Sequence, residues 1–498
     1  MNYTVVVRPE PCYWCESCGY RDVASDSLIR LPLELSAMSA RLAPLSALLA
    51  AVLAVTLLGP LRGDREDATD QPVDLLAAST NRPTPGSFRG YGFDQCLAPS
   101  QAKMDAWMEH SPFMAAGIYI SGNSRACRDQ PNLTATWVRN QLARGWRLLP
   151  ITLGPQASCS TRYPKYGSRV DPVISADPTD GYARAKAQGK LEAERAVTVA
   201  KGLGIVPRST LFYDLEAFDI GNGACKASAI RFVHAWTQRL HQLGYKSGFY
   251  SSAGSGIKMI DWVYQNYPET FALPDTLWIA RWDGNANTSV STDYLSSKAW
   301  LPGGRLKQYQ GGHNETWGGV TINIDRNFLD LGTGMRVAGE THCGGVAVDL
   351  PAYLAIKMPT STYTPPADRV KALQCLLTEK KLYAGTINGR YDLATRRAAY
   401  AWQRSRGFAT NSTWGRRDWI TLTTAGATPV LKYGSTGAYV RRVQRALSAA
   451  MPDRKVQVTG VYDAATAAHA GAYRRQVGMS SYNIVNTATW AKLQAGRF

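Results

Sequence analysis

Two acidic residues, Asp214 and Glu216, stand two positions apart in a short apolar run that spans residues 211–218. Side chains at positions i and i+2 leave the same face of a β-strand, so we expect the two carboxyl groups to project side by side, with Phe212 beneath them. Carboxyl groups held close together shift each other's pKa and can divide into an acid and a base, which is the chemistry of glycoside hydrolysis. The same D-x-E pattern also marks ordinary solvated strand ends, so the surrounding elements decide its meaning.

Strand-like and helix-like runs alternate from Arg89 to Leu331. The expected strands cover residues 90–94, 115–120, 147–153, 210–216, 247–251, 277–282, 306–310 and 322–328. The expected helices between them cover residues 101–108, 133–144, 183–202, 228–243 and 257–266, and the last two connections are shorter and less regular. Eight strands with mostly helical crossovers over about 240 residues predict an α/β fold, a (β/α)8 TIM-like barrel.

Reacting groups in such barrels lie at the C-terminal ends of the strands. Asp94 ends the first expected strand, Asp214 and Glu216 end the fourth, and Asp325 lies in the eighth. These four acids are the candidate catalytic residues. Other strand ends carry the candidate substrate-binding residues, which are Tyr250, Arg281, Trp282, Asp283, Gln308 and Tyr309. The aromatic members offer faces for sugar stacking, although aromatic residues at strand ends also serve as core packing. Likewise, Asp94 and Asp325 could instead accept hydrogen bonds from loop backbone.

Five short motifs, in this order along the barrel, resemble the glycoside hydrolase family 25 muramidases. They are Gly92-Phe93-Asp94, Tyr213-Asp214-Leu215-Glu216, Leu277-Trp278-Ile279-Ala280-Arg281-Trp282, Gln308-Tyr309-Gln310 and Ile324-Asp325-Arg326-Asn327. The chain resembles still more closely the glycoside hydrolase-like domain of secreted actinobacterial proteins, which opens with a similar G-F-D-x-C-x-x-P-S, here residues 92–100.

The resemblance implies a role for each acid. Glu216 would be the general acid, Asp214 would position the N-acetyl group of the substrate or an attacking water, and Asp94 and Asp325 would line the cleft. In the muramidases an aliphatic residue and a serine usually follow the first Asp, whereas Gln95 and Cys96 stand there in this chain. The floor of the site is therefore expected to differ.

The N-terminal region indicates export. Residues 42–58 form an apolar run of signal-peptide length behind Arg41, with Met38 close before it. We therefore expect residues 1–37 to be a start-site artefact or a cytoplasmic extension, residues 38–60 a signal peptide or an uncleaved anchor, and residues 61–85 a linker. Export permits disulfides among the six later cysteines, which are Cys96, Cys127, Cys159, Cys225, Cys343 and Cys375, but the sequence does not choose their pairing. Cys12, Cys15 and Cys18 have no fourth ligand nearby, so no metal site is predicted.

An internal repeat of about 70 residues fills the C-terminal region. Residues 370–377 match 440–447, residues 388–395 match 459–466, and Trp402-Gln403 corresponds to Tyr473-Arg474. Each copy predicts three helices, with Asp392 or Asp463 capping the second. The pattern V-x-x-L-Q-x-x-L followed by G-x-Y-D-x-x-T resembles the peptidoglycan-binding-like three-helix repeat. The expected domains are a barrel over 86–345, a Pro-rich linker over 346–367, and repeats over 368–428 and 429–498.

Positive charge is concentrated in these repeats. The chain has a formal net charge of +18, and residues 368–498 hold 21 Lys and Arg against 6 Asp and Glu. A cationic module suggests an anionic partner, either nucleic acid or a bacterial wall, and the export signal and the repeat favour the wall. The sequence therefore predicts a secreted or wall-associated monomeric glycosidase without a cofactor. Its partner would be peptidoglycan or another envelope glycan, with no nucleic acid, and with the membrane contacted only through the N-terminal anchor. The alternative is an envelope glycan-binding protein whose hydrolase-like barrel is not catalytic.

Overall fold

The computed structural model describes residues 81–333 and 337–498. The expected signal or anchor segment, nearly all of the linker that follows it and the three N-terminal cysteines lie outside these residues. Among the residues described, no helix combines the length and the apolar character that crossing a membrane requires.

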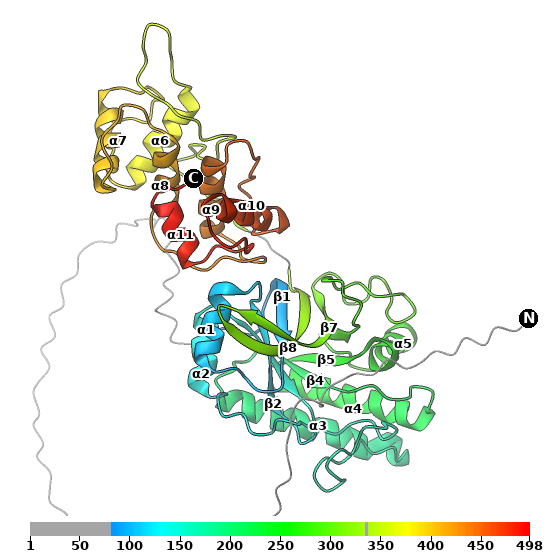
Figure 1. The fold of residues 1–498 in the computed structure, drawn as a ribbon. Coiled ribbons are helices and arrows are strands. Elements are labelled where there is room, and N and C mark those ends of the chain that lie inside the picture. The colour runs from blue at the N-terminus through cyan, green and yellow to red at the C-terminus, as the bar shows by residue number, and fades with distance from the viewer. Residues whose placement is uncertain (1–80, 334–336) are drawn as a thin grey trace, which may run out of the picture. The chain divides into compact units, whose positions relative to one another are not determined.

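Eight strands close into a barrel in sequence order, which confirms the expected α/β TIM-like fold (Figure 1). The strands are β1 (Phe88–Asp94), β2 (Ala115–Ser121), β3 (Arg147–Thr152), β4 (Thr210–Asp214), β5 (Lys246–Ser252), β6 (Thr276–Ala280), β7 (Gly304–Trp317) and β8 (Val320–Leu331). Each of the eight lies where the sequence predicts a strand, and the differences are confined to the ends. The largest differences are in β7 and β8, which extend beyond the barrel as a long hairpin.

Helices follow the first five strands and surround the barrel (Figure 1). They are α1 (Gln101–His110), α2 (Ala135–Ala143), α3 (Thr179–Gly202), α4 (Gly223–Gln242) and α5 (Lys258–Asn266). The buried faces of α3 and α4 show how they pack. The buried residues include small ones on α3, such as Ala193 and Ala196, and large ones on α4, such as Phe232 and Trp236. At Gly189 an added Cβ would lie 2.3 Å from the Phe232 carbonyl oxygen, so the close approach of the two helices requires glycine there.

Strand β8 departs from the all-parallel pattern. Strands β1 to β7 pair in parallel, whereas β8 runs antiparallel to both β7 and β1. The reason is the tight turn between β7 and β8, where Gly318 and Gly319 have φ values of 59° and 77° that glycine adopts without steric cost. Antiparallel pairing sets Asp325 directly opposite Asp94, so an acid in the middle of β8 lies at the C-terminal end of β1.

The C-terminal region is helical. Its helices are α6 (Ala367–Glu379), α7 (Leu393–Ser405), α8 (Arg416–Thr424), α9 (Ala438–Ala450), α10 (Ala464–Gln476) and α11 (Thr487–Gln494), three in each expected copy. Equivalent side chains make equivalent bonds. Asp392 and Asp463 cap α7 and α10, each accepting a backbone hydrogen bond of 2.8 Å. Gln374 and Gln444 each accept a backbone hydrogen bond from a glycine, at 3.0 and 2.9 Å respectively.

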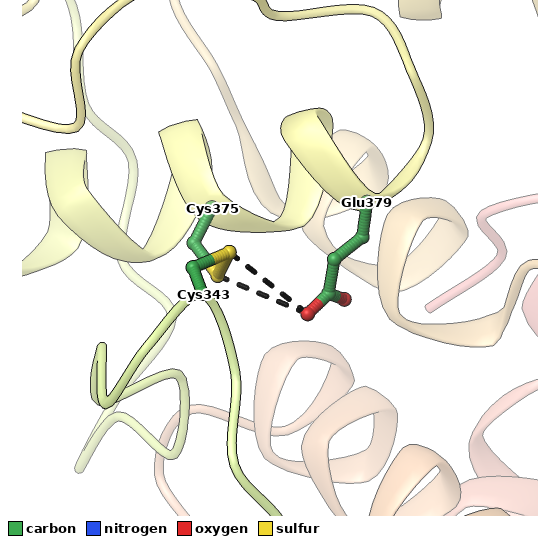
Figure 2. Close-up of side chains that lie close together, drawn as sticks. All are labelled: Cys343, Cys375 and Glu379. Atoms are coloured by element: carbon green, nitrogen blue, oxygen red, sulfur yellow. Dashed lines mark hydrogen bonds between the residues drawn. A yellow bond between two sulfur atoms is a disulfide. The ribbon is translucent and has the colours of Figure 1, made fainter. Parts of the chain in front are cut away.

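The Pro-rich stretch that the sequence assigns to a linker, residues 346–367, does not behave as a free connector. Val348, Tyr353 and Ile356 are buried in the same apolar cluster as the helices. A disulfide between Cys343 and Cys375 ties the preceding segment to α6, and the Glu379 carboxylate lies beside it (Figure 2). Apolar residues between the prolines explain the difference, because burying them stabilises the helical core.

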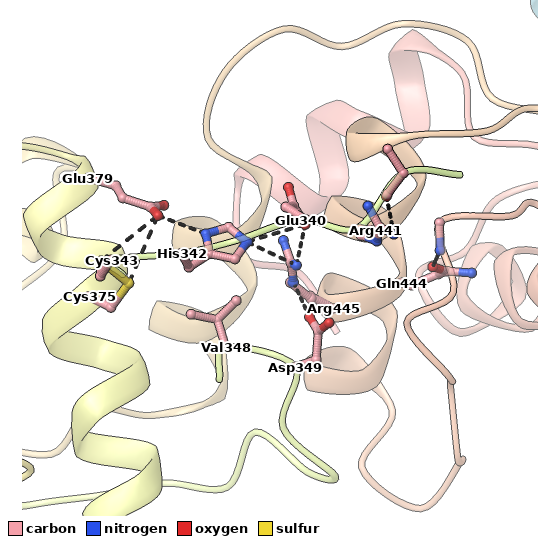
Figure 3. A network of polar contacts seen from close by, with 12 residues as sticks. Glu340, His342, Cys343, Val348, Asp349, Cys375, Glu379, Arg441, Gln444 and Arg445 are labelled. Atoms are coloured by element: carbon pink, nitrogen blue, oxygen red, sulfur yellow. Dashed lines mark hydrogen bonds and ion pairs between the residues drawn. A yellow bond between two sulfur atoms is a disulfide. The ribbon is translucent and has the colours of Figure 1, made fainter. Parts of the chain in front are cut away.

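A buried arginine links this segment to α9. Arg445 is 3% exposed, and its guanidinium contacts Glu340 Oε2 at 2.5 Å and Asp349 Oδ1 at 2.6 Å (Figure 3). His342 extends the network, because its Nδ1 lies 2.7 Å from Glu379 Oε1 and its Nε2 lies 3.2 Å from Glu340 Oε2. These two carboxylates raise the pKa of His342 to about 9.

Replacing Arg445 should loosen α9 selectively. The change Arg445→Met removes the cation that Glu340 and Asp349 share and leaves His342 as the partner of Glu340, so we expect a loss of about 1–3 kcal/mol from the broken charged hydrogen bonds. Hydrogen exchange of the α9 amides, followed by mass spectrometry, should reveal that loss. The control Arg441→Met, on the same helix, removes one exposed bond to the Ala338 carbonyl and should change exchange little. Equal effects of the two variants would contradict the role of the buried pair.

The same network should make the helical region sensitive to alkali. The folded pKa of His342 lies above its ordinary value of 6.5, so its stabilising contribution is complete below pH 6.5 and is lost as the pH rises through about 9. The stability difference between the wild type and His342→Gln, measured by hydrogen exchange of α6, should therefore be largest near pH 6 and small above pH 9. A difference that is independent of pH would exclude this titration.

Candidate functional site

The four expected catalytic acids lie at one end of the barrel. Asp94 and Asp214 are the last residues of β1 and β4, and Asp325 faces Asp94 across the β1–β8 pair. Asp94, Asp214 and Asp325 are 2%, 1% and 0% exposed, whereas the Glu216 side chain is 15% exposed. Charges on all four acids act on the Tyr119 hydroxyl, which places them in one cluster.

Glu216 is not on the strand that was expected to carry it. Strand β4 ends at Asp214, so the prediction that both side chains leave one strand face is wrong for Glu216. Gln156, from the loop after β3, holds the segment beyond the strand. Its Nε2 donates to the Asp214 carbonyl at 2.8 Å, and its Oε1 accepts from the Glu216 amide at 2.8 Å. The position of Glu216 is therefore set by a side chain from a neighbouring loop.

Gln308 is the centre of the cluster. Its Nε2 donates to Asp325 Oδ2 at 2.9 Å and to the Asp94 carboxylate at 3.2 Å. Its Oε1 accepts from the Tyr250 hydroxyl at 3.1 Å and from the Trp282 indole nitrogen at 2.9 Å. One neutral amide on β7 thereby joins residues from β1, β5, β8 and the loop after β6.

Two further side chains complete the contacts of the acids. Asn327 on β8 donates to Asp94 Oδ2 at 2.5 Å, and the Tyr119 hydroxyl on β2 donates to Asp214 Oδ2 at 3.3 Å. The other oxygen of Asp214 is buried without a hydrogen-bond partner among the described residues. A buried acceptor of this kind favours the protonated acid, in which that oxygen need not carry charge.

Burial raises the pKa values of three acids. It raises the pKa of Asp94 to about 6, even though hydrogen bonds from Asn327 and Gln308 act in the opposite direction. It raises the pKa of Asp214 well above its usual range, and the charge of Glu216 adds to this effect. The pKa of Glu216 is raised by burial as well, but Arg162 and Lys165 oppose that rise.

The loop after β3 brings these two cations to the site. Arg162 Nη1 lies 3.9 Å from Glu216 Oε2. A disulfide between Cys159 and Cys225 fastens the loop to the N-terminal turn of α4. The cationic loop therefore acts on Glu216, the acid that is not fully buried.

Three of the six expected substrate-binding residues lie beside the acids, and three do not. Tyr250, Trp282 and Gln308 share the bonds described above. Arg281 is exposed and stacks 5.5 Å from the Tyr294 ring centroid. Asp283 binds the Lys307 ammonium at 2.8 Å. Tyr309 has Arg326, Tyr91 and Glu315 around it instead of the acids. Since side chains alternate along a strand, Gln308 facing the barrel interior sends its neighbour Tyr309 to the other face.

Several residues of the cluster were not assigned from the sequence. They are Tyr119, Gln156, Arg162, Lys165 and Asn327. Tyr119 and Gln156 lie near the C-terminal ends of β2 and β3, so the strand-end rule could have found both. The sequence carries no comparable signal for the loop that holds Arg162.

The acids do not form a recognisable metal centre. Within the described ranges, the group of potential ligands whose atoms lie close enough together is Cys343, Cys375 and Glu379 (Figure 2). The two cysteines of that group are joined in a disulfide, so neither offers the thiolate that a metal would bind.

The titration of Asp94 should be visible in stability. The pKa of Asp94 in the folded protein, about 6, lies above the ordinary value of 3.8. Its contribution to the free energy of unfolding is therefore complete below pH 3.8 and is lost as the pH rises through 6. Asp94→Asn cannot titrate. The stability of the wild type, measured by urea unfolding, should therefore fall relative to that of the variant between pH 4 and 7. A constant difference over that range would contradict the shift.

Comparison with solved structures gives likenesses of low identity. A Bacillus stearothermophilus protein described as uncharacterized is 18% identical, covers 48% of this chain and 95% of its own, and has a TM-score of 0.32. The Tat-secreted protein Rv2525c of Mycobacterium tuberculosis, in complex with L-tartrate, is 14% identical over 48% and 95%, with a TM-score of 0.32. A family 25 glycosyl hydrolase from Bacillus anthracis is 13% identical over 51% and 96%, with a TM-score of 0.28. Scores of this size carry no functional argument, and no curated protein matches the chain.

A family model identifies the barrel. Residues 105–329 match the model of the Rv2525c-like, glycoside hydrolase-like domain. The match begins within α1 and ends near the C-terminal end of β8. Over these residues the barrel is therefore similar to the Rv2525c-like, glycoside hydrolase-like domain.

Proposed function

We propose that this protein is a secreted, wall-associated glycosidase that cleaves peptidoglycan or a related N-acetylated envelope glycan by carboxylate chemistry. The observation that carries the proposal is the pair formed by Asp214 and Glu216, whose pKa values are both raised, at the end of a glycoside hydrolase-like barrel. A pair of carboxyl groups whose burial favours sharing one proton can supply both the acid and the stabilising anion that glycosidic cleavage needs.

We assign the general acid to Glu216. A proton donor must reach the glycosidic oxygen, and Glu216 is 15% exposed while Asp214 is 1% exposed. In the resting protein the proton of the pair belongs mainly to Asp214, because Arg162 and Lys165 favour an ionised Glu216. A bound sugar would displace water from Glu216 and draw it away from Arg162, which raises its pKa and lets it take up the proton.

The chemical step then follows from this distribution of charge. Glu216 gives its proton to the leaving oxygen as the glycosidic carbon–oxygen bond breaks, and ionised Asp214 stabilises the positive charge that develops on the sugar or positions its N-acetyl group. Water adds to the sugar carbon and returns a proton to Glu216. Asp94, held by Gln308, would keep the field around Asp214 negative, and Asp325, bound to the same amide, would reach a sugar hydroxyl group only if the site opens.

The C-terminal helices supply the proposed attachment to the wall. Their two copies share the same capping and glutamine bonds, and they carry most of the net positive charge of the chain. Export agrees with the cysteines, since all six in the described residues form disulfides, Cys96–Cys127, Cys159–Cys225 and Cys343–Cys375.

One observation favours a second candidate function. Three of the four acids are at most 2% exposed, so a substrate would meet Glu216 alone unless the site opens. Such a cluster could serve an envelope glycan-binding protein without turnover, in which the buried acids hold the barrel end together.

Replacing either member of the pair should abolish cleavage. The full chain is incubated with isolated peptidoglycan, and new reducing ends are measured. Glu216→Gln and Asp214→Asn should each lower the rate by about 100-fold or more, because removing a general acid or its partner costs that much. Binding to sedimented wall should persist in both variants.

Glu194→Gln provides the matched control. Glu194 lies on α3, outside the barrel, where it pairs with Arg239, so this variant should keep the wild-type rate. Wild-type protein that sediments with several wall types but releases no reducing ends would refute the glycosidase proposal and support the glycan-binding alternative.

A further inference from the structure

The connection between β6 and β7 contains a loop with the spacing of a cation-binding loop. Asp283, Asn285, Asn287 and Ser289 occupy alternate positions over residues 283–289. Alternating carboxylate, amide and carbonyl oxygens of this kind wrap calcium ions in many proteins. Here a protein cation occupies the loop. The Lys307 ammonium donates to Asp283 Oδ2 at 2.8 Å, to Asn287 Oδ1 at 3.0 Å and to the Ser289 carbonyl at 2.9 Å.

These three hydrogen bonds use all the donors of the Lys307 ammonium. An ammonium has three protons to donate, and three loop oxygens accept them. Lys307 is 0% exposed, and a buried charge persists only where it is paired and hydrogen-bonded. Asp283 supplies the opposite charge, and the hydrogen bond from Lys307 helps to lower its pKa.

The loop depends on the same oxygen donors for its own turns. Asp283 Oδ1 accepts from the Asn285 amide at 2.9 Å while Oδ2 binds Lys307. Asn287 Oδ1 accepts from the Ser289 amide at 2.9 Å and also binds Lys307. Each side chain therefore closes a turn and holds the cation at once, so losing the cation should loosen the turns.

The loop is directly connected to the acid cluster. Asp283 follows Trp282, and Lys307 precedes Gln308, whose Oε1 accepts from the Trp282 indole at 2.9 Å. The Trp282 ring lies against Gly311, where an added Cβ would come within 2.3 Å of it. Trp282 is thus fixed by Gln308, by Gly311 and by the loop that Lys307 closes.

We propose that Lys307 is a positioning residue, an internal cation that stands where a metal ion would stand in a loop of this type and that holds Trp282 beside the acids. Resting on the proposed function, the inference adds that Trp282 offers its ring to a sugar of the glycan. Lys307 itself faces away from the acids and takes no part in bond cleavage.

The first test measures the loop in the ligand-free full chain. In Lys307→Met, the amides of residues 284–289 should exchange with deuterium at least tenfold faster, while exchange across β4 stays unchanged. Lys298→Met, an exposed lysine of the same connection, is the matched control and should behave as wild type. Asp283→Asn removes the opposite charge and should reproduce the effect if Lys307→Met does not fold. Unchanged exchange of the loop in both variants would overturn the proposal.

The second test measures the consequence for glycan. With soluble peptidoglycan fragments as the probe, Lys307→Met and Trp282→Ala should each raise KM about fivefold with little change in kcat, and the double variant should be no worse. A loosened loop with unchanged KM would reject the positioning role of Lys307. If the wild type has no glycosidase activity, the dissociation constant of the same fragments replaces KM. An inactive wild type would therefore count against the proposed function, whereas an unchanged KM or dissociation constant in Lys307→Met would count against the role of Lys307.

Discussion

Withdrawal of carboxyl groups from water at one end of the barrel is the constraint on which the site depends. A buried carboxylate needs a cation or several donors, and its pKa rises where these are insufficient. Asp94 and Asp325 accept hydrogen bonds from the neutral amide of Gln308, and Asp94 also accepts one from the amide of Asn327. Amides supply hydrogen bonds but no compensating charge, so they hold both acids in place while burial still raises the pKa of Asp94 to about 6.

Three cations of the region each act on an identified acid. Arg162 and Lys165 act on Glu216, and the Lys307 ammonium binds Asp283 in the loop that follows Trp282. Glu216 thereby differs from Asp214, because cations oppose the rise of the pKa of Glu216, whereas the charge of Glu216 adds to the rise of the pKa of Asp214. A difference of this kind separates the pKa values of neighbouring carboxyl groups, which is what acid and base roles require.

The sequence predicted the barrel well because its evidence is local. Apolar runs of strand length and helical periodicity recur eight times and five times, and each has its counterpart in the structure. The direction of β8 was not predictable from periodicity, because it depends on the tight Gly318-Gly319 turn.

The strand-end rule placed Asp94, Asp214, Tyr250 and Gln308 correctly, but it cannot tell which side of a strand a residue faces when the strand end is uncertain by one position. Tyr309 was misplaced for that reason, whereas Arg281 and Asp283 lie in the loop beyond the end of β6 at Ala280. Glu216 and Lys307 depend on partners distant in sequence, Gln156 and the 283–289 loop, and no local pattern reports such contacts.

The two C-terminal copies share a three-helix arrangement but differ in one buried side chain. In the first copy Gln403 is buried and its Oε1 accepts from the Asn411 amide at 2.8 Å. At the corresponding position Arg474 is 3% exposed, and its guanidinium reaches the Ser480 carbonyl at 2.8 Å and Asn486 Oδ1 at 3.0 Å. In the second copy an arginine donor thus stands where the first copy has an amide acceptor, and each binds the chain that follows the second helix. Because that side chain is turned inward in both copies, the exchange alters packing rather than the surface, and it says nothing against wall binding by the second copy.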